Sequence, residues 1–497
     1  MDRRRFLQLS TLAAGASMPG LRVFGQQSPL ADVHLIIDTA KPGKRIGSDF
    51  TGLSYESAQL SDPQFFSGDN AQLIGLIRRL GKAGVLRIGG NTSEYCFWKS
   101  DPQQDASASQ KTAQAPAPQG PVGPDPGHRV PPRRVIRPPA VRNLREFLDA
   151  AGWSLIYGLN MGLGTPEAAA DEAAYVTDTI GDRLIAFQLC NEPDLFYKNG
   201  IRPAGYNYAQ FAVEWQRFFQ AIRARVPKAN FAGPDTAFNN EWLVPFAKQF
   251  KQDVRFVSQH YYAEGPPTDA SMTLDRLLHP DPKLQQEFAG MRQMTDDTGL
   301  PFRLAETNSC YAAGKQGVSD TFGAALWGTD LMYRLAQAGG EGINFHGGGY
   351  GWYTPIAGTR KNGFLARPLY YGMLLFAQAG AGQLLESTLD GTGHPAAGQL
   401  RTYVLRGEDG RHKVQVLNLS DSQSVRLTIP AGQSAGSATV LRLSAPRLED
   451  TTDVTLGTSV VGDAGAWTPA ALPSLPVTNS SLVLDIPAAS AALVTLG

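Results

Sequence analysis

The segment LIAFQLCNEPD, residues 184–194, places a glutamate directly after a short apolar run, and the segment FRLAETN, residues 302–308, does the same. Each run has the length and composition of a buried strand. If the two runs are parallel strands of one barrel, Glu192 and Glu306 emerge at the same rim. The two segments therefore indicate both a fold and the place in it where a site would lie.

Eight apolar runs that end in polar or glycine-rich loops are expected to form strands. They span residues 46–53, 85–88, 155–159, 184–189, 230–232, 254–258, 302–305 and 342–345. Segments with helical spacing alternate with them, at residues 70–82, 141–151, 167–179, 208–226, 242–252, 284–298, 321–338 and 369–379. This alternation predicts an α/β fold, a (β/α)8 TIM barrel over residues 46–379. The alternative is a doubly wound open sheet, but no Gly-x-Gly-x-x-Gly loop follows the first strand.

The rest of the chain has a different texture. Residues 1–27 carry Arg3-Arg4-Arg5 ahead of a short apolar stretch, which is typical of a twin-arginine signal peptide, and we expect a periplasmic or secreted protein. Residues 380–497 hold short alternating runs joined by turns and predict an antiparallel β-sandwich domain. Its expected strands are 400–406, 413–419, 424–429, 438–443, 453–456, 482–486 and 492–496. Residues 28–45, an N-terminal segment, are expected to add a strand to that domain.

A Pro-, Gln-, Ala- and Ser-rich stretch, residues 101–140, interrupts the second unit of the barrel. The favoured interpretation is a solvated loop on the face where barrels carry their sites. It also contains Arg129, Arg133, Arg134 and Arg137. The alternative is that some of these arginines steer or bind an anionic substrate.

Composition excludes several classes of function. The net charge is zero and only 18% of residues are charged, which does not suggest a nucleic-acid partner. No segment after residue 27 is apolar for long enough to span a membrane, so we expect no membrane partner once the signal is removed. The three cysteines suggest no disulfide framework, and packing is favoured over a thiol nucleophile. The seven histidines show no ligand spacing, so we expect no metal and no cofactor. His260 and His346 end predicted strands and could line the site, although a structural role is favoured for each. We also expect a monomer.

Two carboxyl groups that face each other across a cleft are the minimal equipment for hydrolysing a glycosidic bond. A single glutamate at the end of a strand is more often a cap or an ion-pair partner. The predicted strands four and seven, however, lie nearly opposite each other across a barrel mouth. Their position favours a catalytic role for Glu192 and Glu306.

The strings LCNEPD, SQHYY and LAETNS, at residues 189–194, 258–262 and 304–309, make the chain resemble glycoside hydrolase family 79 of clan A. This family contains heparanase and β-glucuronidases, and the likeness is to its bacterial β-glucuronidases. The resemblance implies a retaining exo-β-glucuronidase that removes terminal β-linked glucuronic acid from glycosides or acidic polysaccharides. It also implies that Glu192 is the acid/base and Glu306 the nucleophile, with carboxyl groups about 5–5.5 Å apart.

The expected substrate-binding residues come partly from position and partly from the resemblance. Arg87, at a strand end, could hold Glu306 ionised, although a structural ion pair is an equal alternative. Asn191 and Glu56 could bind sugar hydroxyl groups. The resemblance implies that the hydroxyls of Tyr262, Tyr311 and Tyr353, with main-chain N–H groups near Gly351, lie around the sugar and its C6 carboxylate. For each tyrosine, packing is the alternative.

Three other functions remain open from the sequence. One is a clan relative that acts on neutral sugars, and another is a heparanase-like enzyme that cuts inside an acidic polysaccharide. The third is a carbohydrate-binding protein that keeps the barrel without turnover. The presence of both carboxylates argues against the third.

Overall fold

The structure is a computed structural model that describes residues 30–100, 130–391, 395–432 and 435–497. The chain divides into Met1–Leu30 and a compact unit from Ala31 to Gly497, which contains the helices and strands discussed below. The predicted signal peptide, residues 1–27, lies outside the described residues. A search of the described part found no helix with the length and hydropathy needed to cross a membrane.

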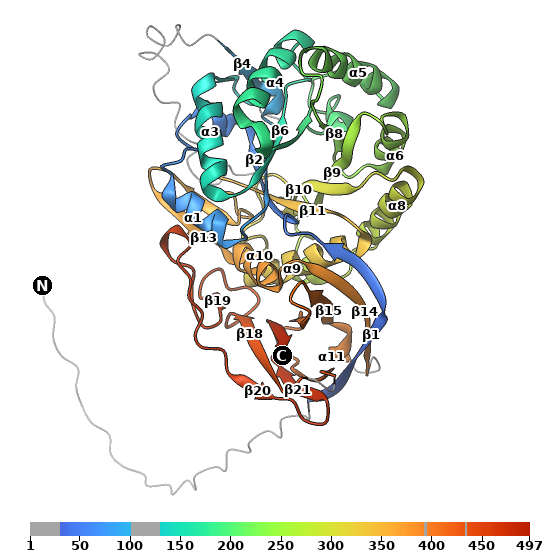
Figure 1. Ribbon diagram of the computed structural model, residues 1–497, viewed down its shortest axis with the longest axis vertical. Coiled ribbons are helices and arrows are strands. Elements are labelled where there is room, and N and C mark those ends of the chain that lie inside the picture. The colour runs from blue at the N-terminus through green and yellow to red at the C-terminus, as the bar shows by residue number, and fades with distance from the viewer. Residues whose placement is uncertain (1–29, 101–129, 392–394, 433–434) are drawn as a thin grey trace, which may run out of the picture. The chain divides into compact units, whose positions relative to one another are not determined.

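Eight parallel strands close into a barrel, and each overlaps a run predicted from the sequence (Figure 1). In barrel order they are β2 (Thr51–Glu56), β3 (Val85–Gly89), β6 (Ser154–Gly158), β7 (Leu184–Gln188), β8 (Phe231–Thr236), β9 (Val254–Glu264), β10 (Phe302–Cys310) and β11 (Gly342–Gly347). β11 pairs with β2 and closes the ring. The predicted TIM barrel is confirmed.

The eight predicted helices all form. They are α1 (Ala71–Arg79), α3 (Pro138–Ala151), α4 (Pro166–Ile180), α5 (Tyr208–Arg225), α6 (Asn240–Gln249), α8 (Pro282–Thr298), α9 (Phe322–Ala338) and α10 (Pro368–Ala379); a further short helix, α7, spans Leu274–Leu278. Their ends follow local chemistry. The side chain of Asn207 accepts from N–H groups in the first turn of α5, and Gly299 ends α8 in the left-handed conformation.

Two strands run five or six residues past their predicted ends, and both lead to the site. β9 runs to Glu264 and β10 to Cys310, so Glu306 lies within a strand rather than at its end. Every residue of β10 is buried. The sequence signal failed here because Thr307 and Asn308 are polar, and a run of buried polar residues looks like a loop in a sequence.

A ten-stranded sheet follows the barrel in sequence, and β1 (Ala31–Ile46) joins it from the other end of the chain (Figure 1). Its other strands are β14 (Gly382–Asp390), β15 (Leu400–Gly407), β16 (His412–Asn418), β17 (Val425–Pro430), β18 (Ser437–Ser444), β19 (Thr455–Leu456), β20 (Ser474–Pro476), β21 (Ser481–Ile486) and β22 (Ser490–Leu496). β1 lies between β14, antiparallel, and β17, parallel. The expected antiparallel domain is therefore one continuous hydrogen-bonded sheet with one parallel pair, because β1 enters from before the barrel.

The sheet packs against the barrel through α9 and α10. The rings of Tyr333 in α9 and Tyr403 in β15 stack with centroids 4.6 Å apart. The Tyr403 hydroxyl donates to Asp330 Oδ1 at 2.5 Å. Leu405 and Leu417 of the sheet belong to the same buried cluster as the barrel helices. The barrel and the sheet thus share one core at this junction.

Smaller elements decorate the barrel. β4 (Cys96–Trp98) pairs with β5 (Arg134–Ile136), and β12 (Ile356–Thr359) forms a hairpin with β13 (Gly363–Ala366); α11 spans Pro395–Gly398. Short 3-10 helices span Ser57–Ser61, Ser93–Tyr95, Gly181–Arg183, Pro193–Leu195 and Asp463–Gly465. The predicted insertion ends earlier than residue 140, because α3 begins at Pro138. Of its four arginines, Arg129 lies outside the described residues, and Arg133 lies over the ring of Phe97.

Candidate active site

Glu192 lies just beyond the end of β7, and its backbone adopts the left-handed conformation, with φ 50° and ψ 56°. Residues other than glycine rarely take this conformation unless their surroundings hold them in it. Here the N–H of Glu192 donates to the carbonyl of Asp235, and the N–H of Asn191 donates to Glu94 Oε1, both at 2.9 Å. Pro193 then begins a 3-10 helix that leads the chain away. The buried turn fixes the direction of the Glu192 side chain.

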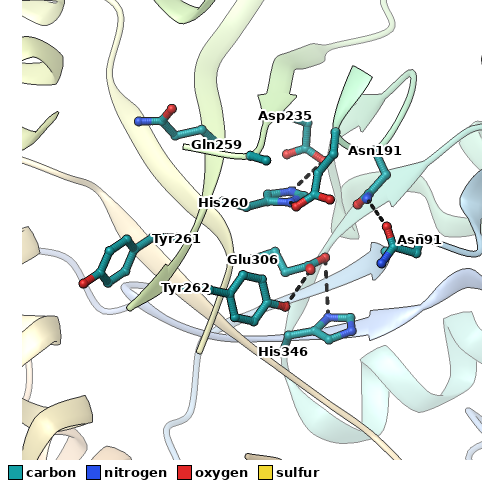
Figure 2. A network of polar contacts seen from close by, with 12 residues as sticks. Asn91, Asn191, Asp235, Gln259, His260, Tyr261, Tyr262, Glu306 and His346 are labelled. Atoms are coloured by element: carbon teal, nitrogen blue, oxygen red, sulfur yellow. Dashed lines mark hydrogen bonds and ion pairs between the residues drawn. The ribbon is translucent and has the colours of Figure 1, made fainter. Parts of the chain in front are cut away.

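Glu306 comes from the opposite side of the barrel. The pairing of β10 with β9 shifts register between Leu304 and Glu306, and such a bulge re-aims the side chain that follows it. One carboxylate oxygen, Oε2, accepts from Arg87 Nη1 at 2.5 Å and lies 3.5 Å from His346 Nδ1. The other, Oε1, accepts from the Tyr262 hydroxyl at 2.7 Å (Figure 2). Both oxygens of Glu306 are thus held before any substrate arrives.

The two predicted glutamates come together in one place. One side-chain oxygen of Glu192, one of Glu306 and a ring nitrogen of His260 all lie within 4.8 Å of one another. Three such groups could in principle hold a cation. However, His260 already uses both nitrogens on carboxylates, and Arg87 already supplies positive charge to Glu306. A metal ion would have to displace these partners, so the arrangement fits an organic substrate better.

Arg87 is the centre of the network beneath the two glutamates. It is only 1% exposed. Its guanidinium donates to side-chain oxygens of Ser54, Gln188, Asn191, Asp235 and Glu306 at 2.5–3.2 Å. Gly89 leaves room for it, because a Cβ at that position would lie 2.3 Å from the Arg87 Cζ. The sequence left two alternatives for Arg87, a structural ion pair or a partner of Glu306. In the structure Arg87 is a buried ion-pair partner and also contacts Glu306.

His260 connects Glu192 to a second buried acid. Its Nδ1 lies 3.0 Å from Glu192 Oε1, and its Nε2 lies 3.1 Å from Asp235 Oδ2. Asp235 also accepts from Gln188 Nε2 at 2.5 Å and from the Ser258 hydroxyl at 3.0 Å. Burial lowers the pKa of His260, but Asp235 and Glu306 outweigh burial and raise it to about 10. His260 is therefore a cation at neutral pH, with one N–H directed at Glu192.

The surroundings move the pKa values of the two glutamates in opposite directions. Burial raises the pKa of Glu192, and the nearby charge of Glu306 raises it further, against the opposing effect of His260. Burial would also raise the pKa of Glu306, but His346, His260 and Arg87 together lower it well below its usual value. Glu306 is thus held as a carboxylate, while Glu192 more readily keeps a proton.

Three further residues, His346, Glu56 and Tyr353, lie near Glu306. His346 Nε2 lies 3.5 Å from Glu56 Oε1, and Glu56 Oε2 accepts from the hydroxyl of Thr92 at 2.6 Å. The ring of Tyr353 is 6.2 Å from that of Tyr262 and 6.0 Å from the imidazole of His346. Glu56, Tyr262 and Tyr353 therefore lie on the same side of Glu306. His346, for which a structural role was favoured, lies 3.5 Å from Glu306.

Two predicted binding residues lie further from the glutamates. Tyr311 is 43% exposed, and its ring covers Gly265 rather than contacting either glutamate. The carbonyl of Gly351 accepts from Arg367 Nη1 at 2.8 Å and from the N–H of Thr354 at 3.1 Å. Neither residue belongs to the contact network around the two carboxyl groups. Any role in binding would require a substrate that reaches them.

The comparisons with known proteins agree with this geometry. The model of "Glycosyl hydrolase family 79, N-terminal domain" matches residues 140–332, a span that holds both Glu192 and Glu306. Residues 140–332 are thus similar to the N-terminal domain of glycosyl hydrolase family 79. Two curated relatives of the chain are β-glucuronidases, one from Neurospora crassa, 25% identical over 388 residues, and one from Aspergillus niger, 26% identical over 358 residues. These alignments cover 69% and 66% of the chain.

The chain spans 66% and 62% of the length of these two β-glucuronidases. Both relatives are fungal, so the expected likeness to bacterial β-glucuronidases is not borne out. Heparanase of Mus musculus is 25% identical over 437 residues, or 78% of each chain. Among solved structures, a 4-O-α-L-rhamnosyl-β-D-glucuronidase from Fusarium oxysporum matches with a TM-score of 0.71 at 17% identity, over 94% of this chain and all of that one. A GH51 arabinofuranosidase from Xanthomonas axonopodis pv. citri matches with 0.67 at 15% identity, over the same shares.

Glu94 is a buried acid beneath the Asn191–Glu192 turn that the sequence did not single out. It is 1% exposed, and burial raises its pKa to about 8. Its oxygen is the acceptor for the Asn191 N–H at 2.9 Å. In the sequence it lies three residues after the Gly-Gly-Asn loop of β3 and looks like an ordinary surface glutamate. Only the fold brings it under β7.

Replacing Glu94 with Gln keeps an acceptor for that N–H and removes the ionisable group. The folded protein binds a proton at Glu94 more tightly than the unfolded chain, so the contribution of Glu94 to stability falls as pH rises from 4.5 to about 8. Relative to the wild type, E94Q is expected to gain on the order of a few kcal/mol of unfolding free energy across this window. Urea unfolding at both ends of the window measures it. A difference that does not change with pH contradicts the assignment, and E94A, which leaves the N–H unpaired, should be less stable than E94Q throughout.

Proposed function

We propose that this chain is a family-79 enzyme, a retaining exo-β-glucuronidase that releases terminal β-linked glucuronic acid from glycosides or acidic polysaccharides. One observation carries the proposal: oxygens of Glu192 and Glu306 lie within 4.8 Å, and the two pKa values move in opposite directions. Retaining glycosidases hold their carboxyl groups about 5–5.5 Å apart, whereas inverting enzymes need about 6.5–9.5 Å to admit a water. The short separation supports double displacement.

In the first step, a Glu306 oxygen attacks the anomeric carbon while Glu192 donates its proton to the glycosidic oxygen. The new bond is an ester between Glu306 and the sugar, and the aglycone leaves as an alcohol. In the second step, Glu192, now a carboxylate, takes a proton from water. The oxygen of that water attacks the anomeric carbon, and Glu306 leaves as a carboxylate. The product has the β configuration of the substrate.

The residues that contact Glu306 and Glu192 have different roles in the two steps. The Tyr262 hydroxyl and Arg87 each hold one oxygen, so the nucleophile is oriented before attack. When the ester forms, Glu306 loses its negative charge and the Arg87 contact weakens, while Asp235 keeps the guanidinium neutralised. His260 donates toward Glu192 Oε1 and stabilises the carboxylate that forms when Glu192 gives up its proton. These roles follow from contacts that exist without substrate.

For the sugar, we propose that Asn191 and Glu56 bind ring hydroxyls and that Tyr353 lies near the C6 group. Tyr353 is buried, and its ring lies 6.2 Å from that of Tyr262, which holds Glu306. Tyr311 and the N–H groups near Gly351 would meet the C6 carboxylate only from the rim. Support for a glucuronide comes from the names of the curated relatives, two of which are β-glucuronidases.

An assay with three aryl glycosides tests the specificity. The β-glucuronide is expected to be cleaved with a kcat/KM at least about a hundredfold above that of the β-glucoside and β-xyloside. A neutral sugar would leave the groups that bind the C6 carboxylate without a hydrogen-bond partner, and this disfavours its transition state. Equal rates on all three would indicate a clan relative for neutral sugars. The likeness to heparanase favours one second candidate, endo cleavage of an acidic polysaccharide. Shortened heparan chains without released monosaccharide would support it, and binding with no turnover would indicate a carbohydrate-binding protein.

The pH dependence of kcat/KM is expected to be bell-shaped. Activity falls at low pH only when Glu306 is protonated, far below its usual pKa, and falls at high pH when Glu192 loses its proton, above its usual pKa. In H260Q, both glutamates lose a neighbouring cation that lowers their pKa values. Both limbs of the profile should therefore move to higher pH. A profile with unchanged limbs in folded H260Q would mean that His260 does not act on this pair.

We also propose that the chain is exported by the twin-arginine route, as residues 1–27 suggest. Secretion should fail when Arg4 and Arg5 are both replaced by Lys, because the translocase reads the arginine pair. Fractionation of cells, followed by amino-terminal sequencing of the exported form, measures both export and the cleavage position. Periplasmic accumulation of the Lys variant would contradict this route.

A further inference from the structure

A cavity of about 290 Å³ lies on the flank of the barrel, away from the two catalytic glutamates. Helices α7 and α9, the end of β9 and strand β15 of the sheet line it. Tyr261 and Tyr262 are neighbours in β9, but their side chains diverge: Tyr262 points to Glu306, and Tyr261 points away from it (Figure 2). The cavity is therefore a separate site. Its volume is at the lower end of ligand sites, which span about 300–1,000 Å³, and suits one sugar ring.

The cavity contains a buried acceptor without a partner. Glu264 lines it and is 8% exposed. Its Oε1 forms an ion pair with Arg276 Nε at 2.9 Å, but its Oε2 is buried and has no hydrogen-bond partner among the described residues. A buried carboxylate oxygen without a donor is costly. A ligand hydroxyl group could supply that donor.

Two arginines that line the cavity have guanidinium N–H groups for which the described residues provide no hydrogen-bond partner. Arg334 lies 3.9 Å from Asp330, which is beyond hydrogen-bond distance. Arg401 uses one nitrogen, Nη1, on the main-chain carbonyls of Gly398 and Leu400. Arg334, Arg401 and Tyr403 all line the cavity, and the two guanidinium charges oppose the rise in the pKa of Tyr403 that burial and Asp330 cause. They are placed to donate to an acceptor beside this ring.

Aromatic rings complete the wall. Trp327 and Tyr403 both line the cavity, and the hydroxyl of Tyr403 is fixed on Asp330 at 2.5 Å. Tyr261 is fixed in the same way on Asp281, at 2.9 Å. Flat rings held in one orientation offer their faces to the C–H groups of a sugar. The combination of fixed rings, a free acceptor and free donors is that of a carbohydrate site.

We propose that this cavity binds one uncharged pyranose unit, as a non-catalytic sugar site at the junction of barrel and sheet. Three arginines line it, Arg276, Arg334 and Arg401, and three carboxylates balance them, Glu264, Asp281 and Asp330. This balance does not favour an anion. A neutral sugar has hydroxyl groups that both donate to Glu264 and accept from the arginines. The site would hold a neutral unit of a glycan independently of what the barrel mouth cleaves.

Titration with methyl β-glucoside, followed by saturation-transfer NMR, tests the proposal. R334Q and R401Q should each weaken binding at least about tenfold, since a hydrogen bond to a charged group contributes about 1.5–3 kcal/mol. R411Q is the matched control, because Arg411 lies in an exposed turn, where it pairs with Asp409. Aryl β-glucuronide hydrolysis should stay unchanged in all three variants. E306Q should bind methyl β-glucoside as the wild type does, so failure of the proposed function would not imitate failure of this site.

Three results would overturn the proposal. The first is no detectable binding of methyl β-glucoside. The second is equal binding by R334Q, R401Q and R411Q. The third is tighter binding of inorganic sulfate or free glucuronate than of methyl β-glucoside at the arginine-dependent site, which would make it an anion site. Thermal unfolding midpoints close to that of the wild type would show that the variants are folded.

Discussion

E306Q is expected to lower kcat on an aryl β-glucuronide by at least about four orders of magnitude, because an amide cannot form the glycosyl ester. The amide still fits the space of the carboxylate: its oxygen can accept from Arg87, and its NH2 group can donate to the Tyr262 hydroxyl, the two groups that hold the native oxygens. Binding of the sugar should therefore change far less than turnover. Steady-state kinetics and the affinity for glucuronate measure the two effects separately.

D194N serves as the matched control for E306Q. Asp194 is a buried acid close to Glu192 in sequence, but it binds the N–H of Ala237 and the side chain of Asn239 rather than the carboxyl pair. Its loss should affect stability more than kcat. If E306Q retains wild-type turnover, or if D194N loses as much activity as E306Q does, Glu306 is not the nucleophile.

E192A is expected to show an effect that depends on the leaving group. With an alkyl glucuronide, which needs protonation to leave, kcat should fall by roughly 10²–10⁴-fold. With an activated aryl leaving group, the first step needs less help, and hydrolysis of the glycosyl ester should become rate-limiting. Azide, which attacks without a general base, should then restore turnover and give a β-glucuronosyl azide.

The configuration of that azide separates the two roles. Attack on the glycosyl ester of Glu306 gives the β product, whereas direct displacement on the substrate gives the α product. E306Q should gain at most the α azide. If azide fails to restore E192A, or if E192A yields only the α azide, Glu192 and Glu306 do not have the roles proposed. The two assays together distinguish a retaining pair from an inverting pair.

Much of the barrel could be predicted because strand and helix signals alternate along the chain with regular spacing. Each predicted strand corresponds to a strand of the closed ring, and each predicted helix forms. The errors lie at element ends and in the sheet. β14 was not predicted, since its sequence GQLLESTLD follows α10 closely and alternates only weakly. β10 extends past Glu306 because Thr307, Asn308 and Cys310 pair with β9, and the sequence did not predict strand there because two of these residues are polar.

The site shows the same division. Glu192, Glu306, Arg87 and Tyr262 could be located from strand ends and short motifs. In the structure Arg87 and Tyr262 both contact Glu306, and an oxygen of Glu192 lies within 4.8 Å of one of Glu306. The residues that link them could not be assigned that role from the sequence. His260 could be placed at a strand end but was favoured as structural, and Asp235 was given no role, yet together they connect Glu192 to the guanidinium of Arg87. Such partners are chosen by side-chain direction across neighbouring strands, which depends on register and on bulges.

The most direct test of the account is to identify the residue that carries the sugar during turnover. A 2-deoxy-2-fluoro-β-glucuronosyl fluoride reacts with a retaining enzyme and leaves a long-lived ester, because fluorine slows the second step more than the first. Peptide mass spectrometry of the inactivated protein should place one label on Glu306. A label on another residue, or hydrolysis of the aryl glucuronide to the α anomer with no label, would contradict the mechanism.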